Sequence, residues 1–197
     1  MKSYLKESTN VLDYGCGSGG FVKYLRDKSI NAYGYDPIVQ YDALGESDFL
    51  TNRQIWENKK YDIIFLWHVL EHTHNPLALV QNLKKRLNKN GKIFIAIPNF
   101  KSFDSKYYGK YWAGLDTPRH LWHFSRKSIQ MIAKKYNFDI FNEKRLYLDS
   151  IYVSYLSEKY KRNHFPIFFG SIIGLISIFK SLFTRESSSF LFVLKEI

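Results

Sequence analysis

Short, nearly continuous apolar runs alternate along this chain with segments in which apolar residues recur every three or four positions. The first pattern predicts strands covered on both faces, and the second predicts amphipathic helices. The predicted strands are, in chain order, NVLDYGC (10–16), INAYGYD (30–36), YDIIFLWHV (61–69), KIFIAIPN (92–99), FDIFNEKRLY (138–147) and SSFLFVLKEI (188–197). The predicted helices are GFVKYLRDK (20–28), NPLALVQNLKKRLNKNG (75–91) and SRKSIQMIAKKYNF (125–138). This alternation predicts an α/β fold with parallel strands joined by crossover helices.

Capping and turn residues mark the expected ends of the later helices. Asn75 is a suitable N-cap with Pro76 in the first turn, and Asn90 with Gly91 is expected to end the same helix. Ser125 is expected to cap the next helix. The last two strands are expected to pair antiparallel and to close the sheet.

Composition narrows the class of protein. A chain of 197 residues with 45% hydrophobic residues is expected to form a single domain with a packed core. The lone Cys16 excludes an internal disulfide and suits a reducing cytoplasm, and residues 1–10 show no signal-peptide pattern. The net charge is +3 over residues 1–100 and +8 over residues 101–197. An anionic partner therefore fits the second half, although a charge excess also serves plain solubility.

The glycine-rich turn after the first strand raises the question of the cofactor. Gly15, Gly17 and Gly20 match the dinucleotide pattern G-x-G-x-x-G, which a nicotinamide oxidoreductase would use. Asp13, however, would repel a pyrophosphate at this turn, whereas it would attract a cationic or zwitterionic cofactor such as S-adenosylmethionine. Asp36, at the end of the second strand, is placed to accept both ribose hydroxyls of either cofactor.

Five segments in a fixed order carry a family resemblance. They are LDYGCGSG (12–19), Asp36, YDIIFLWHVLEH (61–72) with NP after it, LNKNGKIFIAIPN (87–99) and PRHLWHFS (118–125). Together they resemble the class I S-adenosylmethionine-dependent methyltransferases, in the branch that includes the ubiquinone-biosynthesis O-methyltransferases. The resemblance implies a Rossmann-like three-layer sandwich, mostly parallel, with an antiparallel C-terminal strand.

The resemblance also implies roles for the cofactor residues. Gly15 and Gly17 would let the backbone approach the methionine part of S-adenosylmethionine, with S-adenosylhomocysteine as the product. Asp13 would hold the amino end and Asp36 the ribose. The segment 38–60 is poorly patterned, with a short strand predicted near 48–50, and by similarity Asp48 with Phe49 would contact adenine. Trp67 and His68 would line the pocket beside the methyl group. In the alternative interpretation, Asp13 bonds to turn amides and Asp36 is a simple turn residue.

Methyl transfer from a sulfonium needs an in-line nucleophile, exclusion of water and, for a protonated nucleophile, a base. Histidines cluster at two predicted strand ends: His68, His72 and His74 in one group, His120 and His123 in the other. We hypothesise His120 as the base, with His68 and His72 as further catalytic candidates. Arg119, His120 and His123 are expected to face the acceptor. In the alternative, Trp122 and Phe124 are core aromatics and Arg119 is a surface charge.

A metal site is considered at the first histidine group. His68, Glu71 and His72 resemble the Glu-x-x-Glu-His pattern with which some quinone O-methyltransferases hold a divalent ion, but His68 replaces the first acid. We therefore expect no metal, and we expect Glu71 and His72 to bond to the backbone and to each other.

A hydrophobic helical insertion is predicted at about 147–186, before the last strand. Residues 163–179 carry no charge, yet seventeen helical residues span only about 25 Å, and Pro166 would shorten the helix further, which argues against a transmembrane span. The small residues Gly170, Gly174, Ser177 and Ser181 predict one narrow packing face. Because only about ten residues precede the first strand, this insertion is the expected source of a cap. It could equally form a homodimer contact or lie on an anionic membrane.

The sequence as a whole predicts methyl transfer from S-adenosylmethionine to an oxygen of an apolar or lipid-linked small molecule, such as a quinone or a glycolipid or polysaccharide precursor. The expected location is the cytoplasm or the inner membrane surface. Two alternatives stay open: an RNA methyltransferase, and a non-catalytic cofactor-binding subunit that needs a partner. Nucleic acid fits less well, because the chain has no Asn-Pro-Pro-Tyr-like base-flipping motif.

Overall fold

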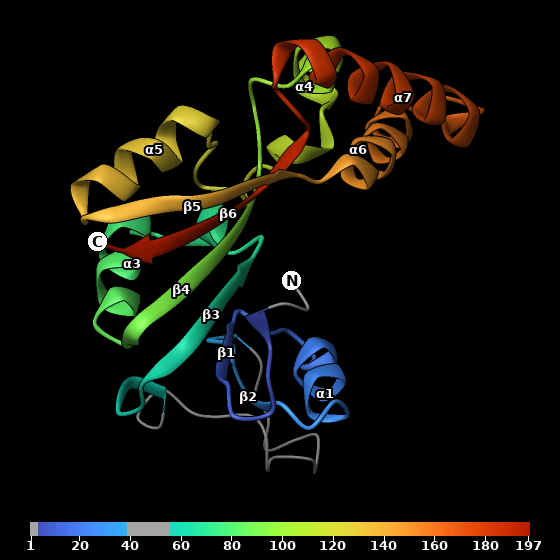
Figure 1. The fold of residues 1–197 in the computed structure, drawn as a ribbon. Coiled ribbons are helices and arrows are strands. Elements are labelled where there is room, and N and C mark those ends of the chain that lie inside the picture. The colour runs from blue at the N-terminus through green and yellow to red at the C-terminus, as the bar shows by residue number, and fades with distance from the viewer. Residues whose placement is uncertain (1–3, 39–55) are drawn as a thin grey trace.

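The computed structural model describes residues 4–38 and 56–197 (Figure 1). Its six-stranded sheet has the order β2-β1-β3-β4-β6-β5. The strands are β1 (Asn10–Tyr14), β2 (Asn31–Tyr35), β3 (Tyr61–Trp67), β4 (Leu87–Pro98), β5 (Phe138–Arg145) and β6 (Ser189–Glu196). Strands β2, β1, β3 and β4 are parallel, and β6 is antiparallel to both of its neighbours, β4 and β5. The predicted Rossmann-like sheet with an antiparallel closing pair is thus confirmed.

Helices cover both faces of the sheet. Side chains alternate along each strand, so the apolar strands present apolar side chains on both faces, and both have to be covered. The helices are α1 (Gly20–Arg26), α3 (Pro76–Lys84), α4 (Phe103–Tyr108), α5 (Arg126–Lys135), α6 (Tyr147–Tyr160) and α7 (Pro166–Thr184). From β3, Phe65 packs in the layer with Leu25 of α1, whereas Leu66 packs in the layer with Leu83 of α3 and Ile132 of α5. Figure 1 shows α1 on one side of the sheet and α3 and α5 on the other.

The end of α3 differs from the prediction. Helix α3 begins as expected, with the Asn75 side chain accepting a hydrogen bond from the Ala78 amide, but it ends at Lys84 rather than at Gly91. Leu87 is already in β4, where it is buried and pairs with Tyr61. The register then shifts before Lys92 pairs with Ile63, and Asn90 takes a positive φ of 65° within the strand. Burial of Leu87 therefore overrides the helical pattern.

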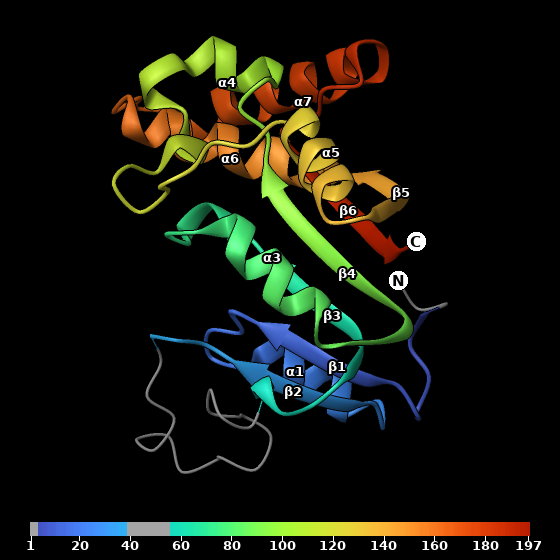
Figure 2. The same ribbon diagram turned by 90° about the vertical axis from the view of Figure 1, so that its left-hand side faces the viewer.

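The predicted insertion forms a hairpin of α6 and α7 between β5 and β6. Together with α4 it makes a further layer beyond the end toward which β4 runs (Figure 2). Helix α7 begins at Pro166, so residues 163–165 lie outside it, but it continues beyond residue 179 to Thr184 and has 19 residues rather than seventeen. Within the described ranges, α7 is the one helix whose length and composition would allow it to cross a membrane.

The small residues of α7 form its buried face, as predicted. Gly170, Gly174, Ser177 and Ser181 are buried, and the two glycines lie against the backbone of Tyr155 and Ile151 in α6. The two helix axes can approach closely because no Cβ atoms separate them at these positions.

The carboxylate of Asp104 ties α4 to α7. It is fully buried and accepts hydrogen bonds from Ser177 Oγ at 2.7 Å, Ser188 Oγ at 2.7 Å and Trp112 Nε1 at 2.8 Å. Ile173 packs beside it with Tyr108 and Trp112. The helical layer is therefore a built part of the fold with its own small core.

Gly174→Ala is expected to destabilise the protein through this helix contact. An added Cβ would lie 2.6 Å from Ile151 Cα and 2.9 Å from the Ser150 carbonyl oxygen, both backbone atoms that cannot rotate away. Forced separation of α6 and α7 should lower the free energy of unfolding by about 1–3 kcal/mol, measured by chemical denaturation. Ser171→Ala, on a half-buried position of the same helix, is the control. Equal stability of Gly174→Ala and wild type would contradict the contact.

Candidate functional site

The glycine turn after β1 brings the ends of β1 and β2 together. The amides of Gly15 and Cys16 both donate to the Tyr35 carbonyl oxygen, at 2.6 and 3.2 Å. Gly15 has φ +81°, and a Cβ there would collide with Val69. Gly17 has φ +52°, and a Cβ there would meet no described atom within 4 Å. The turn thus combines a backbone that favours glycine with a position, Gly17, at which no atom of residues 4–38 and 56–197 would meet a Cβ, and this suits the close approach of a ligand.

Asp13 is the buried acid of this site. Its side chain is on β1, the residue is 3% exposed, and Oδ1 has no hydrogen-bond partner among the described residues. Burial, with a smaller contribution from the nearby charge of Asp36, raises the pKa of Asp13 to about 7. The alternative in which Asp13 bonds to turn amides does not account for Oδ1. An unpartnered, buried carboxylate oxygen is a suitable acceptor for an ammonium group.

Asp36 connects the two strand ends. Its Oδ2 accepts from the Gly17 amide at 3.0 Å, and its Oδ1 accepts from the Ile38 amide at 2.9 Å. The second bond is the one expected of a turn residue, and the first places the carboxylate beside the glycine turn. Contact of Asp36 with a ribose stays a prediction. Asp48 and Phe49, predicted for adenine, lie outside the described residues.

Trp67 and His68 end β3 in different surroundings. Trp67 stacks on Phe65 at 5.7 Å and meets Phe21 edge-on, so it forms part of the layer under α1. His68 has φ +53°, and its Nδ1 is 3.1 Å from Glu71 Oε1 while its Nε2 is 3.6 Å from Asp149 Oδ2. Burial alone would lower the pKa of His68, but the bonds to Asp149 and Glu71 outweigh it and raise the pKa to about 9. A histidine protonated at neutral pH does not fit the role of a proton acceptor.

His72 and His120 lie side by side, with ring centroids 4.6 Å apart. His72 Nδ1 is 3.1 Å from the Arg119 carbonyl oxygen, and His120 Nδ1 is 2.8 Å from the Gly114 carbonyl oxygen. A carbonyl can only accept, so each Nδ1 is the donor in its hydrogen bond, and in a neutral imidazole the other nitrogen, Nε2, has the lone pair. Burial lowers the pKa of His120, although the bond to Gly114 works against this. His120 is thus a neutral imidazole at physiological pH.

Glu71 contacts both the loop that carries His120 and the side chain of His68. Its backbone oxygen accepts from the amides of Leu121 at 2.7 Å and Trp122 at 3.2 Å, which fixes the loop that carries His120. Its carboxyl group is 1% exposed; Oε1 bonds to His68, and Oε2 has no partner within residues 4–38 and 56–197.

The potential metal ligands differ from the predicted set. Glu71, His72 and His120 each offer a ligand atom, and these atoms lie within 4.8 Å of one another. His68, which we placed in this group, instead spans Glu71 and Asp149. Glu71 and His72 also do not bond to each other in the way expected: Glu71 bonds to His68, and His72 bonds to the Arg119 backbone. Glu71 Oε2, which has no partner among the described residues, and the two imidazoles, each held by a backbone carbonyl, form a ligand set that suits a divalent cation.

The remaining substrate candidates lie at the exposed side of the loop. Arg119 is 71% exposed and directs its guanidinium to Asp116 at 2.6 Å, so that group is already engaged. His123 Nε2 donates to the Leu115 carbonyl at 3.0 Å. Phe124 is buried, as the core alternative required, whereas Trp122 is about half exposed and donates to the Thr73 carbonyl.

Asp149 is the residue of this side-chain group that the sequence did not reveal. It comes from the first turn of α6, inside the inserted hairpin, and reaches back to His68 at the end of β3. Its surroundings, LYLDSIY, have no pattern that would separate it from other helix-start acids.

The strand order and the turn after β1, with an acid preceding it, are those of a class I S-adenosylmethionine-dependent methyltransferase. The chain belongs to the family described as Methyltransferase domain, whose model matches residues 2–143. S-adenosylmethionine is the cofactor of this class, so the nicotinamide alternative is set aside.

Solved structures agree on the fold. A SAM-dependent methyltransferase from Archaeoglobus fulgidus is 19% identical and superposes with a TM-score of 0.63, covering 99% of this chain and 89% of that one. The mycolic acid cyclopropane synthase CmaA1, solved with SAH and CTAB, is 14% identical with a TM-score of 0.64, covering 98% of this chain and 79% of that one.

Two curated relatives differ in the acceptor that their names give. The ubiquinone biosynthesis O-methyltransferase of Glaesserella parasuis is 28% identical, over 49% of this chain and 51% of that protein. The tRNA U34 carboxymethyltransferase of Campylobacter lari is 30% identical, over 48% of this chain and 38% of that protein. The chain therefore spans about half or less of the length of these relatives.

Proposed function

We propose that this chain transfers a methyl group from S-adenosylmethionine to an oxygen of an apolar or lipid-linked small molecule, such as a quinone or a glycolipid or polysaccharide precursor. The observation that carries the proposal is His120. It is a half-buried, neutral imidazole whose Nδ1 proton is committed to Gly114, which leaves Nε2 to accept a proton from a hydroxyl group.

The cofactor residues act by binding and orientation. The bound cofactor supplies a methyl group that is already activated on sulfur. Asp13 Oδ1 would accept from its ammonium group, Gly17 leaves room for it, and Asp36, beside the same turn, would accept from the ribose. None of these residues needs to change its protonation during transfer, so they position the methyl group only.

The acceptor residues act by accepting a proton and holding charge. His120 would take the hydroxyl proton on Nε2, and the imidazolium formed would lie next to the Asp116 carboxylate, 3.8 Å away. If a divalent cation is held by Glu71, His72 and His120, it would lower the pKa of the acceptor hydroxyl instead. Helix α6 reaches the end of β3 through the contact of Asp149 with His68, and from there the layer of α4, α6 and α7 would help to keep water from the sulfonium.

RNA methylation is the second candidate function. The Campylobacter lari relative acts on tRNA by its name, and the second half of this chain carries a net charge of +8. The apolar character of the helical layer favours the small-molecule acceptor over RNA.

The test incubates the purified chain with methyl-labelled S-adenosylmethionine and either a catechol compound bearing a short prenyl tail or unmodified tRNA. We expect label in the catechol product as a methyl ether, identified by mass spectrometry. Label in tRNA alone would support the second candidate. Binding of S-adenosylhomocysteine without transfer to either acceptor, or to a panel of sugar-lipid precursors, would leave the non-catalytic subunit.

A further inference from the structure

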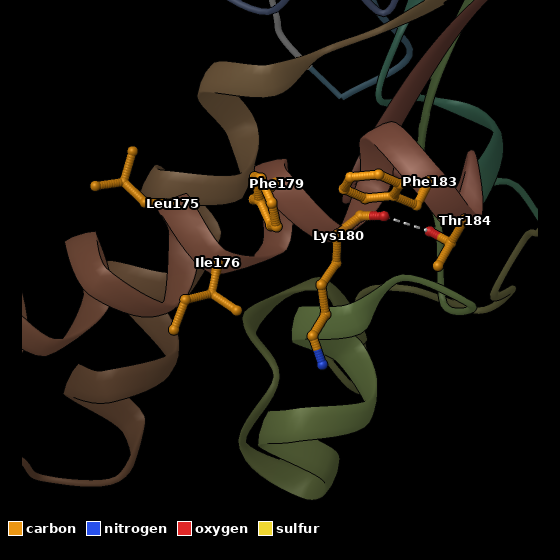
Figure 3. Close-up of a pocket in the computed structure, with 6 residues that line it drawn as sticks. All are labelled: Leu175, Ile176, Phe179, Lys180, Phe183 and Thr184. Atoms are coloured by element: carbon orange, nitrogen blue, oxygen red, sulfur yellow. Dashed lines mark hydrogen bonds between the residues drawn. The ribbon is translucent and has the colours of Figure 1, made fainter.

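Helix α7 exposes a continuous apolar surface. We define the apolar face of α7 as Ile167, Phe168, Leu175, Phe179, Leu182 and Phe183, which are 53–74% exposed. A groove lined by Leu175, Ile176, Phe179 and Phe183 runs along it, and Figure 3 shows these side chains side by side on the helix. Exposed apolar area of this extent is rare on a protein that meets only water.

The opposite face of α7 is fixed to the protein. Gly170 and Gly174 lie against the α6 backbone, Ser177 donates to the buried Asp104, and Arg145 donates to the Ser181 carbonyl at 2.8 Å. Crossing a bilayer would require these contacts to break or would carry the buried carboxylate of Asp104 into hydrocarbon. The contacts therefore favour a helix that lies along a surface over one that spans it.

Basic residues border the apolar face. The sequence from Lys159 to Arg185 contains no acidic residue. Lys159, Lys161 and Arg162 are exposed where α6 ends and the turn to α7 begins, and Arg185 is exposed at the other end of α7. Lys161 also lies 3.6 Å from the buried Glu158, whose charge it offsets in part. Lys180 also lines the groove, and its ammonium group lies over the Phe103 ring of α4, 4.0 Å from the ring centroid.

The positive charge near both ends of α7 favours anionic lipid over a second copy of the chain as the partner of the apolar face. A second copy packed on the same face would bring two sets of like charges together, which costs free energy. Anionic lipid headgroups would instead neutralise them while the aromatic side chains enter the boundary between headgroups and acyl chains.

We propose that the apolar face of α7 docks in the plane of an anionic lipid bilayer, with the basic residues at both helix ends paired to lipid phosphates. The binding itself does not rest on the proposed function, since it needs neither cofactor nor acceptor.

Flotation of the full chain with vesicles tests the proposal. Vesicles of phosphatidylcholine are compared with vesicles that also contain phosphatidylglycerol, at low and at physiological salt. We expect flotation with the anionic vesicles, a loss of at least tenfold in Phe168→Ser/Phe179→Ser, and about a fivefold loss for each of Lys161→Gln and Arg162→Gln. Met131→Ser, an exposed apolar position on α5, is the matched control and should float like wild type.

Folding and self-association are measured on the same samples. Circular dichroism and S-adenosylhomocysteine binding establish that each variant is folded. Failure of wild type to float, or equal flotation of the double variant, would overturn the proposal. So would a dimer, detected by light scattering without lipid, that the same substitutions dissociate. Loss of methyl transfer with flotation intact would count against the proposed function alone.

Discussion

Asp13→Asn is expected to weaken the binding of S-adenosylhomocysteine at least tenfold and, at the same time, to stabilise the cofactor-free protein above pH 7. Both effects come from the same buried carboxylate. When ionised, it offers Oδ1 to the ammonium group of the ligand, and without the ligand it is a buried charge with one oxygen unpaired.

The pH dependence of stability has a definite sign. Burial and the charge of Asp36 raise the pKa of Asp13 from 3.8 to about 7, so the folded protein holds this proton more tightly than the unfolded chain does. The free energy of unfolding therefore falls as the pH rises from about 4 to 7. One pKa unit corresponds to about 1.4 kcal/mol, so the loss amounts to up to about 4 kcal/mol, which Asp13→Asn removes.

Ligand binding should show the opposite dependence on pH. Below pH 7 the wild type must release a proton from Asp13 before it can bind the ammonium group, so its affinity falls by up to tenfold for each unit of pH. Calorimetric titration and chemical denaturation across pH 5 to 8 measure both effects. Asp27→Asn, at an exposed helix end, is the control. Binding of wild type that is independent of pH would exclude Asp13 as the ammonium acceptor.

His120→Ala is expected to lower kcat by about 10²–10⁴-fold with little change in the KM for S-adenosylmethionine. The substitution removes the proton acceptor and leaves the glycine turn untouched. In wild type, kcat/KM should rise as the pH increases through a pKa below 6.5 and then stay level, because burial lowers the pKa of His120. His120→Gln should lose this inflection.

Other histidines give distinct outcomes. An inflection near pH 9 would point to His68, whose pKa is raised to about 9 by Asp149 and Glu71. His74→Ala, an exposed position in the same part of the chain, should leave the rate unchanged. Two results would assign His120 to metal ligation rather than to proton transfer. One is that a divalent cation restores the activity of His120→Ala, and the other is that a chelator abolishes the activity of the wild type.

The cofactor half of the site could be predicted because it is local in sequence. Asp13, Gly15 and Gly17 follow one strand, and Asp36 ends the strand that pairs with it in parallel, so their proximity follows from the sheet alone. The end of α3 could not be predicted locally. The pattern in 85–91 is compatible with a helix, and only the pairing of Leu87 with Tyr61 shows that a strand begins at Leu87.

The acceptor half depends on contacts between segments far apart in the chain. His120 meets His72 because the Glu71 carbonyl binds two amides of the 116–123 loop, and this bond has no sequence signal. Asp149 reaches His68 only because the hairpin folds back over the sheet edge. Because it contacts two carboxylates, His68 fits a charged partner of these groups better than the catalytic candidate that the sequence predicts.

The hairpin of α6 and α7 leaves and rejoins the sheet at neighbouring points. Arg145 pairs with Phe190, and the Leu146 amide donates to the Ser189 carbonyl, so the inserted segment begins and ends on one rung of the β5–β6 ladder. The pairing of β5 with β6 would be the same if a single tight turn joined the two strands in place of the insertion. Its length and composition can therefore diverge between relatives while the cofactor half stays the same. Because Ser177 of α7 donates to the buried Asp104 of α4, we expect α4 to vary together with the hairpin.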